Sequence, residues 1–190
     1  KYQIKFDAIY LAPEPKKKLI MRSHEYIINQ NQYTGEEILN MDCYGNRIKL
    51  NFNHPVNGCL IYFKDENGFV NSDILEKCTL LLNGRQRCEY LGDILKCEGF
   101  HHIGLKDSQK LDGYYWLPIG RINDRLDNEN DHESHSTINF SVIDCGVLEV
   151  IIKPEAKKII GDKELYIHIH CQSSNVMRYM SGMAGLSHSK

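Results

Sequence analysis

Residues 46–56 read Asn46-Arg-Ile-Lys-Leu-Asn-Phe-Asn-His-Pro-Val56, and the order of apolar and polar residues in this stretch decides the fold class. Ile48, Leu50 and Phe52 alternate with polar residues, which is the period of a strand that buries one face. A His-Pro pair then breaks the alternation, and the turn leads into a second apolar run at Cys59–Phe63. The stretch therefore predicts one strand, a turn and the start of the next strand.

Strands separated by turns continue on both sides of this stretch. Asn83-Gly84 is a signal for a two-residue hairpin, because both residue types tolerate a positive φ. Residues 121–136 are rich in Asp and Glu and nearly free of apolar residues, so they indicate a long solvated loop between strands. Such loops are typical of Greek-key and jelly-roll connections. The other predicted strands are Tyr2–Leu11, Cys78–Leu82, Gln86–Leu91, Tyr114–Leu117, Thr137–Val142, Gly146–Ile152 and Leu165–Cys171.

The segment between the first predicted strand and Asn46 has a weaker pattern. A short helix is expected at residues 16–21, because Pro15 fits the first turn of a helix. Residues 24–33 carry many polar amides and are expected to be an extended connector, and Gly and Asn residues indicate a loop over residues 34–46. Since the chain shows many short strands and no long helical period, it predicts an all-β sandwich or barrel.

The composition is that of an ordinary globular protein. The chain has 190 residues, of which 42% are hydrophobic and 25% charged, which suits one domain with a buried core, or one domain and part of another. The formal net charge of -2 argues against a dedicated nucleic-acid binder, which would carry a strong basic excess. No apolar run approaches the length of a membrane span, and the N-terminal residues have the pattern of a strand rather than of a signal peptide.

The cysteines indicate buried thiols rather than a disulfide framework. Their number is odd, no two form a Cys-x-x-Cys pair, and several lie inside apolar runs. This usage is typical of reduced, buried thiols in an intracellular protein. The cysteines are Cys43, Cys59, Cys78, Cys88, Cys97, Cys145 and Cys171.

Two groups of histidines have spacings that could serve metal binding. His168 and His170 are two residues apart on a predicted strand, so they share one face, but no spacing indicates a third or fourth ligand. We interpret them as the polar face of that strand. A second cluster, within residues 131–135, lacks the glycine and the ordered spacing of a calcium loop, so we interpret it as solvated loop. This cluster consists of Asp131, His132, Glu133 and His135.

Three further features suggest chemistry but have a simpler structural interpretation. Cys97, with His101 and His102 nearby, has no glycine-rich elbow and no residue placed by motif to orient a base. The basic run Lys16–Lys18 is typical of a solvated helix face rather than of a nucleic-acid or membrane contact. Residues 182–185 lack the Lys-Ser/Thr of a phosphate loop, and we expect their small side chains to permit close packing against the sandwich or a neighbouring subunit. No catalytic, cofactor-binding or metal-binding residue is therefore predicted.

Three stretches are specific enough to indicate a family. They read Ser23-His-Glu-Tyr-Ile-Ile-Asn-Gln-Asn-Gln-Tyr-Thr-Gly-Glu36, the stretch Asn46–Val56 quoted above, and Asn175-Val-Met-Arg-Tyr-Met-Ser-Gly-Met-Ala-Gly-Leu-Ser-His-Ser189. Leu80–Arg85 and Ser136–Asp144 support them. In this order, and over nearly the whole chain, they resemble the major capsid proteins of nucleocytoplasmic large DNA viruses. The chain departs from the family pattern at Glu133–Ser136, at Val142 and in the acidic loop Arg121–Glu133.

The resemblance implies a fold of two consecutive jelly rolls, of which this chain holds the second. Residues 1–12 then correspond to the last strand of a first roll that is otherwise absent, and residues 13–45 correspond to the connector. Residues 46–190 correspond to the complete C-terminal jelly roll. The expected fold class is an all-β, antiparallel jelly-roll β-sandwich.

The same resemblance implies a structural role, with no enzymatic activity and no cofactor. The chain is expected to be a major capsid protein subunit or fragment that forms the icosahedral shell of a large DNA virus. Its expected partners are other capsid subunits, as a homotrimer in the full-length protein, and minor capsid proteins, with no direct nucleic-acid contact and no membrane span. The expected location is the virion capsid, after assembly in the host cytoplasm. The loops 64–71, 91–113 and 121–133 are the candidates for contacts between subunits.

The alternative is a carbohydrate-binding jelly-roll module, because lectins share this architecture. Tyr114, Tyr115 and Trp116 supply aromatic rings for such a site. Adjacent strand residues point to alternating faces, however, so the three rings cannot all line one surface.

Residues 1–12 generate a first testable prediction. Tyr2, Ile4 and Phe6 lie on one apolar face of a strand whose sheet belongs to the first roll, and unpaired strands of this kind recruit other chains. We expect the 190-residue chain to self-associate, and deletion of residues 1–12 to improve its solubility while the sandwich stays folded. Size-exclusion chromatography of both proteins measures this. A monodisperse full-length monomer, or a deletion that unfolds residues 46–190, would show that this strand pairs with the second roll.

Overall fold

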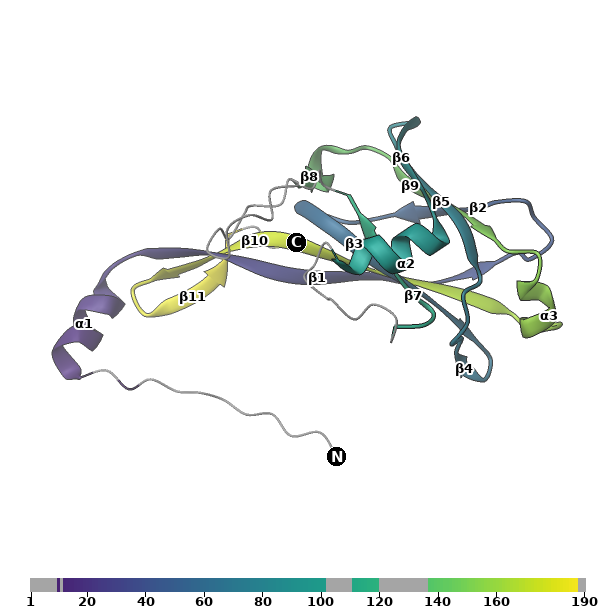
Figure 1. Ribbon diagram of the computed structural model, residues 1–190. Coiled ribbons are helices and arrows are strands. Elements are labelled where there is room, and N and C mark those ends of the chain that lie inside the picture. Colours follow the sequence, from purple (N-terminus) through teal and green to yellow (C-terminus); the bar gives the residue numbers. More distant parts are fainter. Residues whose placement is uncertain (1–9, 11, 102–110, 120–136, 188–190) are drawn as a thin grey trace. The chain divides into compact units, whose positions relative to one another are not determined.

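The computed structural model describes residues 10, 12–101, 111–119 and 137–187 of the chain (Figure 1). The chain divides into two compact units. The sandwich unit comprises residues 29–174, and the terminal unit is formed by residues 1–28 together with residues 175–190. Apart from Tyr10, the predicted strand Tyr2–Leu11 lies outside the described residues, and so does the acidic loop Arg121–Glu133.

Strands dominate the described residues, and the helices are short. The helical elements are α1 (Pro13–Met21), α2 (Gly92–His101), the 3-10 turn η2 (Phe140–Val142) and α3 (Ala156–Ile160). The strands are β1 (His24–Leu39), β2 (Asn46–Leu50), β3 (Pro55–Asp65), β4 (Gly68–Phe69), β5 (Leu75–Leu82), β6 (Arg85–Leu91), β7 (Tyr114–Pro118), β8 (Ile138–Asn139), β9 (Gly146–Ile152), β10 (Leu165–Met180) and β11 (Met183–Leu186).

The sandwich unit contains parts of two sheets (Figure 1). The larger sheet has the strand order β1-β10-β3-β4, and β7 and β8 also pair with β3. The smaller sheet has the order β2-β9-β5-β6. The central pairs are antiparallel: β10 with β3 in the larger sheet, and β9 with both β2 and β5 in the smaller one.

The chain crosses repeatedly from one sheet to the other. It runs from β2 in the smaller sheet to β3 and β4 in the larger one, returns for β5 and β6, crosses for β7 and β8, and returns once more for β9 before β10. Many neighbours within each sheet are therefore distant in sequence, which is the path of a jelly roll. The fold is the antiparallel jelly-roll β-sandwich that the sequence predicts.

Each sheet directs alternate side chains into one shared core. On β3, for example, Ile61 and Phe63 are fully buried, whereas Tyr62 between them points to the other face and is half-buried. The smaller sheet contributes Ile48 and Leu50 from β2, Cys78 and Leu80 from β5, and Leu148 and Val150 from β9. The larger sheet contributes Cys59, Ile61 and Phe63 from β3, Tyr115 and Leu117 from β7, and Leu165, Ile167, Ile169 and Cys171 from β10.

The turn predicted at Asn83-Gly84 is confirmed. It joins β5 to β6, and both residues have a positive φ, of 50° and 76°. That pair of angles is typical of the two-residue turn whose twist matches antiparallel strands. The asparagine side chain adds a long-range contact, because its Oδ1 accepts a hydrogen bond of 3.0 Å from the main-chain N–H of Cys145.

The segment 91–113, predicted as a loop, contains the helix α2. Leu95 and Phe100 of α2 are buried, and the helix packs against β5 and β7. Gly92 and Gly99 weaken the helical pattern in the sequence, since glycine is a poor helix former. Both glycines are instead required by close approach: a Cβ would lie 2.1 Å from the main-chain oxygen of Leu75 at Gly92, and 2.2 Å from that of Trp116 at Gly99.

Other boundaries also differ from the sequence prediction. Residues 24–33 are extended as predicted, but the strand continues to Leu39, so the predicted loop 34–46 shrinks to residues 40–45. The reason is that Leu39 is buried in the core at the end of the strand. The predicted loop 64–71 is mainly the tight β3–β4 hairpin. The predicted strand Thr137–Val142 pairs only through β8 and then forms η2, because the Asn139 side chain accepts a hydrogen bond from the N–H of Ser141.

The close contact at Gly99 can be tested by substitution. Gly99→Ala adds a methyl group where only 2.2 Å separates the Cβ position from the Trp116 oxygen. We expect a loss of about 1–3 kcal/mol in the free energy of unfolding, even though alanine is the better helix former by about 1 kcal/mol. Urea unfolding followed by the fluorescence of Trp116, the single tryptophan, measures it.

Gly185→Ala is the matched control, because no atom of the described residues lies within 4 Å of a Cβ at that position. Its effect should stay within about 0.5 kcal/mol. Equal stability of the Gly99→Ala variant and the wild type would show that α2 does not need this close approach.

Candidate functional site

The outer face of the larger sheet, which points away from the core, carries a row of aromatic and imidazole rings. His168 and His170 lie on β10, and their neighbours are Tyr62 on β3 and Tyr33 on β1. Two further rings, from β4 and β7, extend the row beyond Tyr62. We call this group the ring ladder, and it consists of Tyr33, Tyr62, Phe69, Tyr114, His168 and His170.

The two histidine rings of the ladder stack on the rings of Tyr33 and Tyr62. Tyr33 lies 4.3 Å from His170 between centroids, with 9° between the planes, and Tyr62 lies 4.9 Å from His168, with 2° between the planes. The strand register explains these neighbours, because Tyr62 is directly opposite His168 on β10 and opposite Tyr114 on β7. Side chains at directly opposite positions share one face and meet.

Hydrogen bonds connect the tyrosines to the histidines. The hydroxyl of Tyr33 lies 2.7 Å from Nδ1 of His168, and the hydroxyl of Tyr62 lies 3.3 Å from Nε2 of His170. His168 is only 3% exposed. Among the described residues its Nε2 has no hydrogen-bond partner, and the carboxylate of Glu36 lies 3.7 Å away, beyond hydrogen-bond length.

The surroundings of the two histidines favour the neutral rings. Burial lowers the pKa of His168 below its usual value, Lys64 and His170 act in the same direction, and Glu36 opposes them. Burial, followed by Lys64, also lowers the pKa of His170. The pair does share one strand face, as the sequence predicts. Within the described residues, however, no group of three or more His, Cys, Asp or Glu side chains could hold a metal ion.

Polar side chains also attach β1 to the sandwich. The side-chain amide of Gln32 donates to the main-chain oxygen of Asn53 at 2.6 Å and to Oγ of Ser173 at 2.8 Å. Its oxygen accepts from the N–H of Asn53 at 2.9 Å. Ser173 is fully buried, and its hydroxyl donates to the main-chain oxygen of Gln30. We call this group, Gln30, Gln32, Asn53 and Ser173, the glutamine clamp.

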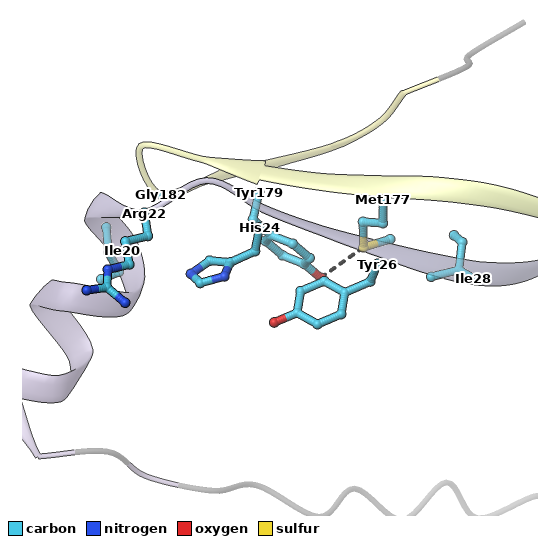
Figure 2. A pocket seen from close by; sticks show the side chains of 8 residues that line it. All are labelled: Ile20, Arg22, His24, Tyr26, Ile28, Met177, Tyr179 and Gly182. Atoms are coloured by element: carbon cyan, nitrogen blue, oxygen red, sulfur yellow. Dashed lines mark hydrogen bonds between the residues drawn. The ribbon is translucent and has the colours of Figure 1, made fainter.

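The terminal unit contains an apolar groove with a volume of about 550 Å³ (Figure 2). Tyr26 and Tyr179 meet edge to face at 5.7 Å, and the Tyr179 hydroxyl donates to the sulfur of Met177. Arg22 and His24 give the α1 side of the groove a polar character (Figure 2). The groove is lined by Ile20, Arg22, His24, Tyr26, Ile28, Met177, Tyr179 and Gly182.

The β10–β11 hairpin gives the terminal unit a further apolar surface. Met180 pairs with Met183 across the turn Ser181-Gly182, and both turn residues have a positive φ, of 52° and 78°. Among the described residues no atom lies within 4 Å of a Cβ at Gly185, so close packing of residues 182–185 against a neighbouring subunit stays a prediction. The exposed large apolar residues among the described residues of this unit are Tyr10, Ile20, Met21, Tyr26, Ile27, Tyr179, Met180, Met183 and Leu186.

The structure separates the other residues that the sequence singled out. Lys16–Lys18 are exposed on α1, as expected of a solvated helix face. Cys97 is exposed on α2, which ends at His101, and His102 lies outside the described residues, as does the cluster Asp131, His132, Glu133 and His135. No helix among the described residues is long and apolar enough to cross a membrane.

The three aromatic residues of β7 do not form a platform. Tyr115 is buried against Phe63, and its hydroxyl accepts a hydrogen bond from the N–H of Leu75. Trp116 lies on the opposite face, where its indole covers Gly58 and leaves no room for a Cβ there. Tyr114 belongs to the ring ladder. The alternation of faces that the sequence implies for these residues is confirmed.

All cysteines are free, and they fall into two classes. Cys59, Cys78 and Cys171 are buried and Cys88 is half-buried, whereas the remaining three, Cys43, Cys97 and Cys145, are exposed. Burial raises the pKa of Cys59 well above its usual value and raises those of Cys78 and Cys171 to about 12. The prediction of buried thiols therefore holds for the sandwich core and not for the exposed three.

Comparisons with known proteins point to one group of proteins. No family model matches the chain. The chain is 28% identical to a major capsid protein of Pyramimonas orientalis virus, over 96% of this chain and 48% of that protein. It is 31% identical to a major capsid protein of Chrysochromulina ericina virus, over 45% of this chain and 13% of that protein. The chain thus spans about half, or less, of the length of these curated relatives.

Solved structures support the fold. A chain of the PBCV-1 virus capsid matches with a TM-score of 0.69 and 18% identity, over 95% of this chain and 55% of the matched chain. The Faustovirus major capsid protein matches with a TM-score of 0.59 and 8% identity, over 88% of this chain and 36% of the matched chain. At these identities the likeness concerns the fold, and it agrees with the jelly-roll path described above.

The two classes of cysteine can be distinguished by their reactivity. We expect Cys43, Cys97 and Cys145 of the folded chain to react with a thiol reagent within minutes at about pH 8, because the thiolate is the reactive form. Cys59, Cys78 and Cys171 should stay unmodified until the chain unfolds, since burial both blocks access and raises their pKa. Mass spectrometry of peptides after labelling with and without denaturant measures this. Rapid labelling of Cys59 in the native chain would contradict the buried core.

Proposed function

We propose that this chain, a homologue of the major capsid proteins of large DNA viruses, is a structural subunit of a viral capsid shell. The support is the similarity of nearly the whole chain to capsid proteins, together with the jelly-roll sandwich that both share. The proposed role is assembly by burial of complementary surfaces. It requires no reaction, and we propose that the chain has no enzymatic activity.

The terminal unit supplies the surface that best fits this role. Its exposed residues include Met21, Ile27 and Met183, with exposed fractions of 82%, 80% and 70%. The exposed residues Ile20, Tyr26 and Tyr179 line the groove, and apolar surface of this kind typically marks protein contacts, because a large apolar side chain gains about 1.5–3 kcal/mol when it is fully buried. We propose that other capsid protein surfaces cover the groove and the β10–β11 hairpin.

The finer features of assembly are also proposals. We propose a homotrimer for the full-length protein, because most soluble oligomers are closed and symmetric and a rigid sandwich offers repeated surfaces for such contacts. Minor capsid proteins are proposed as further partners, with no direct contact to nucleic acid, in keeping with the net charge of -2. The proposed location is the virion, after assembly in the host cytoplasm. The proposed division into residues 1–12, 13–45 and 46–190 follows the same family resemblance.

A carbohydrate-binding function is not favoured. A sugar platform needs rings that are open on one surface, but Tyr115 is buried in the core and Trp116 is only 8% exposed over Gly58. Tyr114 stacks on Phe69 within the ring ladder. The aromatic residues that suggested a lectin are therefore occupied with packing.

Incorporation into particles tests the proposed function. A tagged chain expressed in cells infected with the virus that encodes it should be present in purified virions. The variant Met180→Glu/Met183→Glu should be depleted about tenfold or more, because it places charges in the proposed contact and costs at least the burial energy of the methionines. Quantitative mass spectrometry of gradient-purified virions measures both.

Val142→Glu is the matched control for this experiment. Val142 is 71% exposed, close to the 70% of Met183, but it belongs to the sandwich unit. We expect it to enter virions like the wild type. Absence of the wild-type chain from virions would refute the capsid role, and equal incorporation of all three proteins would refute the proposed contact surface.

A further inference from the structure

Besides its main-chain pairing with β10, β1 is held on the sandwich by polar and aromatic side-chain contacts. Within residues 29–39, the part of β1 in the sandwich unit, Leu39 is the one buried residue. The side-chain contacts that fasten this part of the strand include the glutamine clamp and the stack of Tyr33 on the two histidines. The protonation state of the histidines in the ring ladder therefore influences how firmly this strand is held.

The contacts of His168 assign its proton. Nε2 faces the carboxylate of Glu36 at 3.7 Å, so we place the proton of the neutral ring on Nε2, where it points toward a negative charge. Nδ1 is then the acceptor for the hydroxyl of Tyr33 at 2.7 Å. Burial and Glu36 raise the pKa of Tyr33, so this hydroxyl remains a donor throughout the physiological range.

Protonation of His168 changes this arrangement. The second proton goes to Nδ1, which turns the acceptor into a donor, so the Tyr33 hydroxyl can no longer donate to it. The new charge lies on a ring that is 3% exposed, and the burial of a charge is costly. His170, two residues away on the same face, also becomes positively charged when it is protonated, and burial lowers its pKa as well.

The groups around the two rings offer little compensation. Among the described residues, the ammonium of Lys64 on β3 is a third positive charge, and the carboxylate of Glu36 is the negative charge nearest to His168. The faces of the tyrosine rings can attract a cation. These rings already contact the neutral histidines, however, so they do not replace the water that would hydrate a charged histidine ring. The titratable groups that face the pair are Tyr33 and Glu36 from β1, Tyr62 and Lys64 from β3, Tyr114 from β7 and Tyr166 on β10 itself.

We propose that the ring ladder is an acid-sensitive clasp: it fastens β1 to β10 and β3 while His168 and His170 are neutral, and protonation of the two rings loosens this strand. The jelly-roll core stays folded when the clasp opens. This inference concerns the folded chain and does not rest on its proposed role in a capsid, so a negative virion result leaves it standing.

The direction of the pH effect follows from the histidines. Both have a lower pKa in the folded chain than the usual 6.5, so below about pH 6.5 the unfolded chain binds more protons than the folded chain. The stabilisation is therefore complete above about pH 6.5 and is lost as the pH falls from there through the pKa values of the folded state. Acid weakens the clasp, and neutral pH restores it.

Hydrogen exchange and urea unfolding of the full 190-residue chain test the clasp. Between about pH 7.5 and about pH 5.5, the range in which histidine changes charge, we expect residues 29–39 to lose protection relative to β9, residues 146–152. We also expect the urea midpoint to fall. In His168→Gln/His170→Gln both losses should shrink, because glutamine keeps hydrogen-bonding capacity but does not titrate. His24→Gln, which changes another histidine of β1, should behave like the wild type.

Titration of the histidine rings by NMR gives a readout that does not require the double variant to fold. In the wild type, His168 should show the Nε2–H tautomer and a pKa below 6.5. Tyr33→Phe should move that pKa upward, because it removes a hydrogen bond to the neutral ring and keeps the aromatic face. A wild-type pKa of 6.5 or higher would overturn the proposal. So would equal protection losses in residues 29–39 and 146–152, or equal pH sensitivity of a folded double variant and the wild type.

Discussion

The antiparallel pairing of β10 with β3 determines which side chains lie on each face of the larger sheet. Its register places Cys171 opposite Cys59 and Ile169 opposite Ile61 on the core side, and His168 opposite Tyr62 on the outer side. Because side chains alternate along a strand, a shift by one residue would move the histidines into the core and expose the apolar set. Burial of the apolar set therefore selects the register, and the ring ladder forms as a consequence of that selection.

The ring ladder and the terminal unit handle their apolar side chains differently. In the sandwich unit the outer rings cover one another, so His168 on that face is almost fully buried by its neighbours. In the terminal unit Met183 and Ile27 remain largely exposed, and among the described residues no side chain fills the groove beside Tyr26. Rings that cover one another leave little apolar area exposed to a partner, whereas exposed apolar area favours association. This contrast is why we propose the terminal unit as an assembly surface.

The sequence predicted what depends on local pattern and missed what depends on distant partners. The alternation in Leu165–Cys171 predicted the first part of β10, which continues to Met180, and the pair Asn83-Gly84 predicted the β5–β6 hairpin of the smaller sheet. The family motifs were sufficient for the jelly roll. Helix α2 was missed because Gly92 and Gly99 serve contacts with strands far away in the sequence. The face shared by His168 and His170 was predictable from spacing, but their partner Tyr33 was not, because the pairing of β1 leaves no periodic apolar signal in a strand rich in amides.

The polar character of β1 gives the chain a way to respond to acid without weakening its core. The core consists of aliphatic and aromatic residues with thiols and the phenol of Tyr115, and burial raises the pKa of Cys171 and of Tyr115 to about 12. None of these core groups gains a proton between about pH 5 and about pH 8. The glutamine clamp does not titrate either, so it holds β1 near Gln32 while the histidine rings become protonated. Proton uptake therefore acts on the contact between β1 and its neighbours, and the apolar layer between the two sheets keeps the sandwich together.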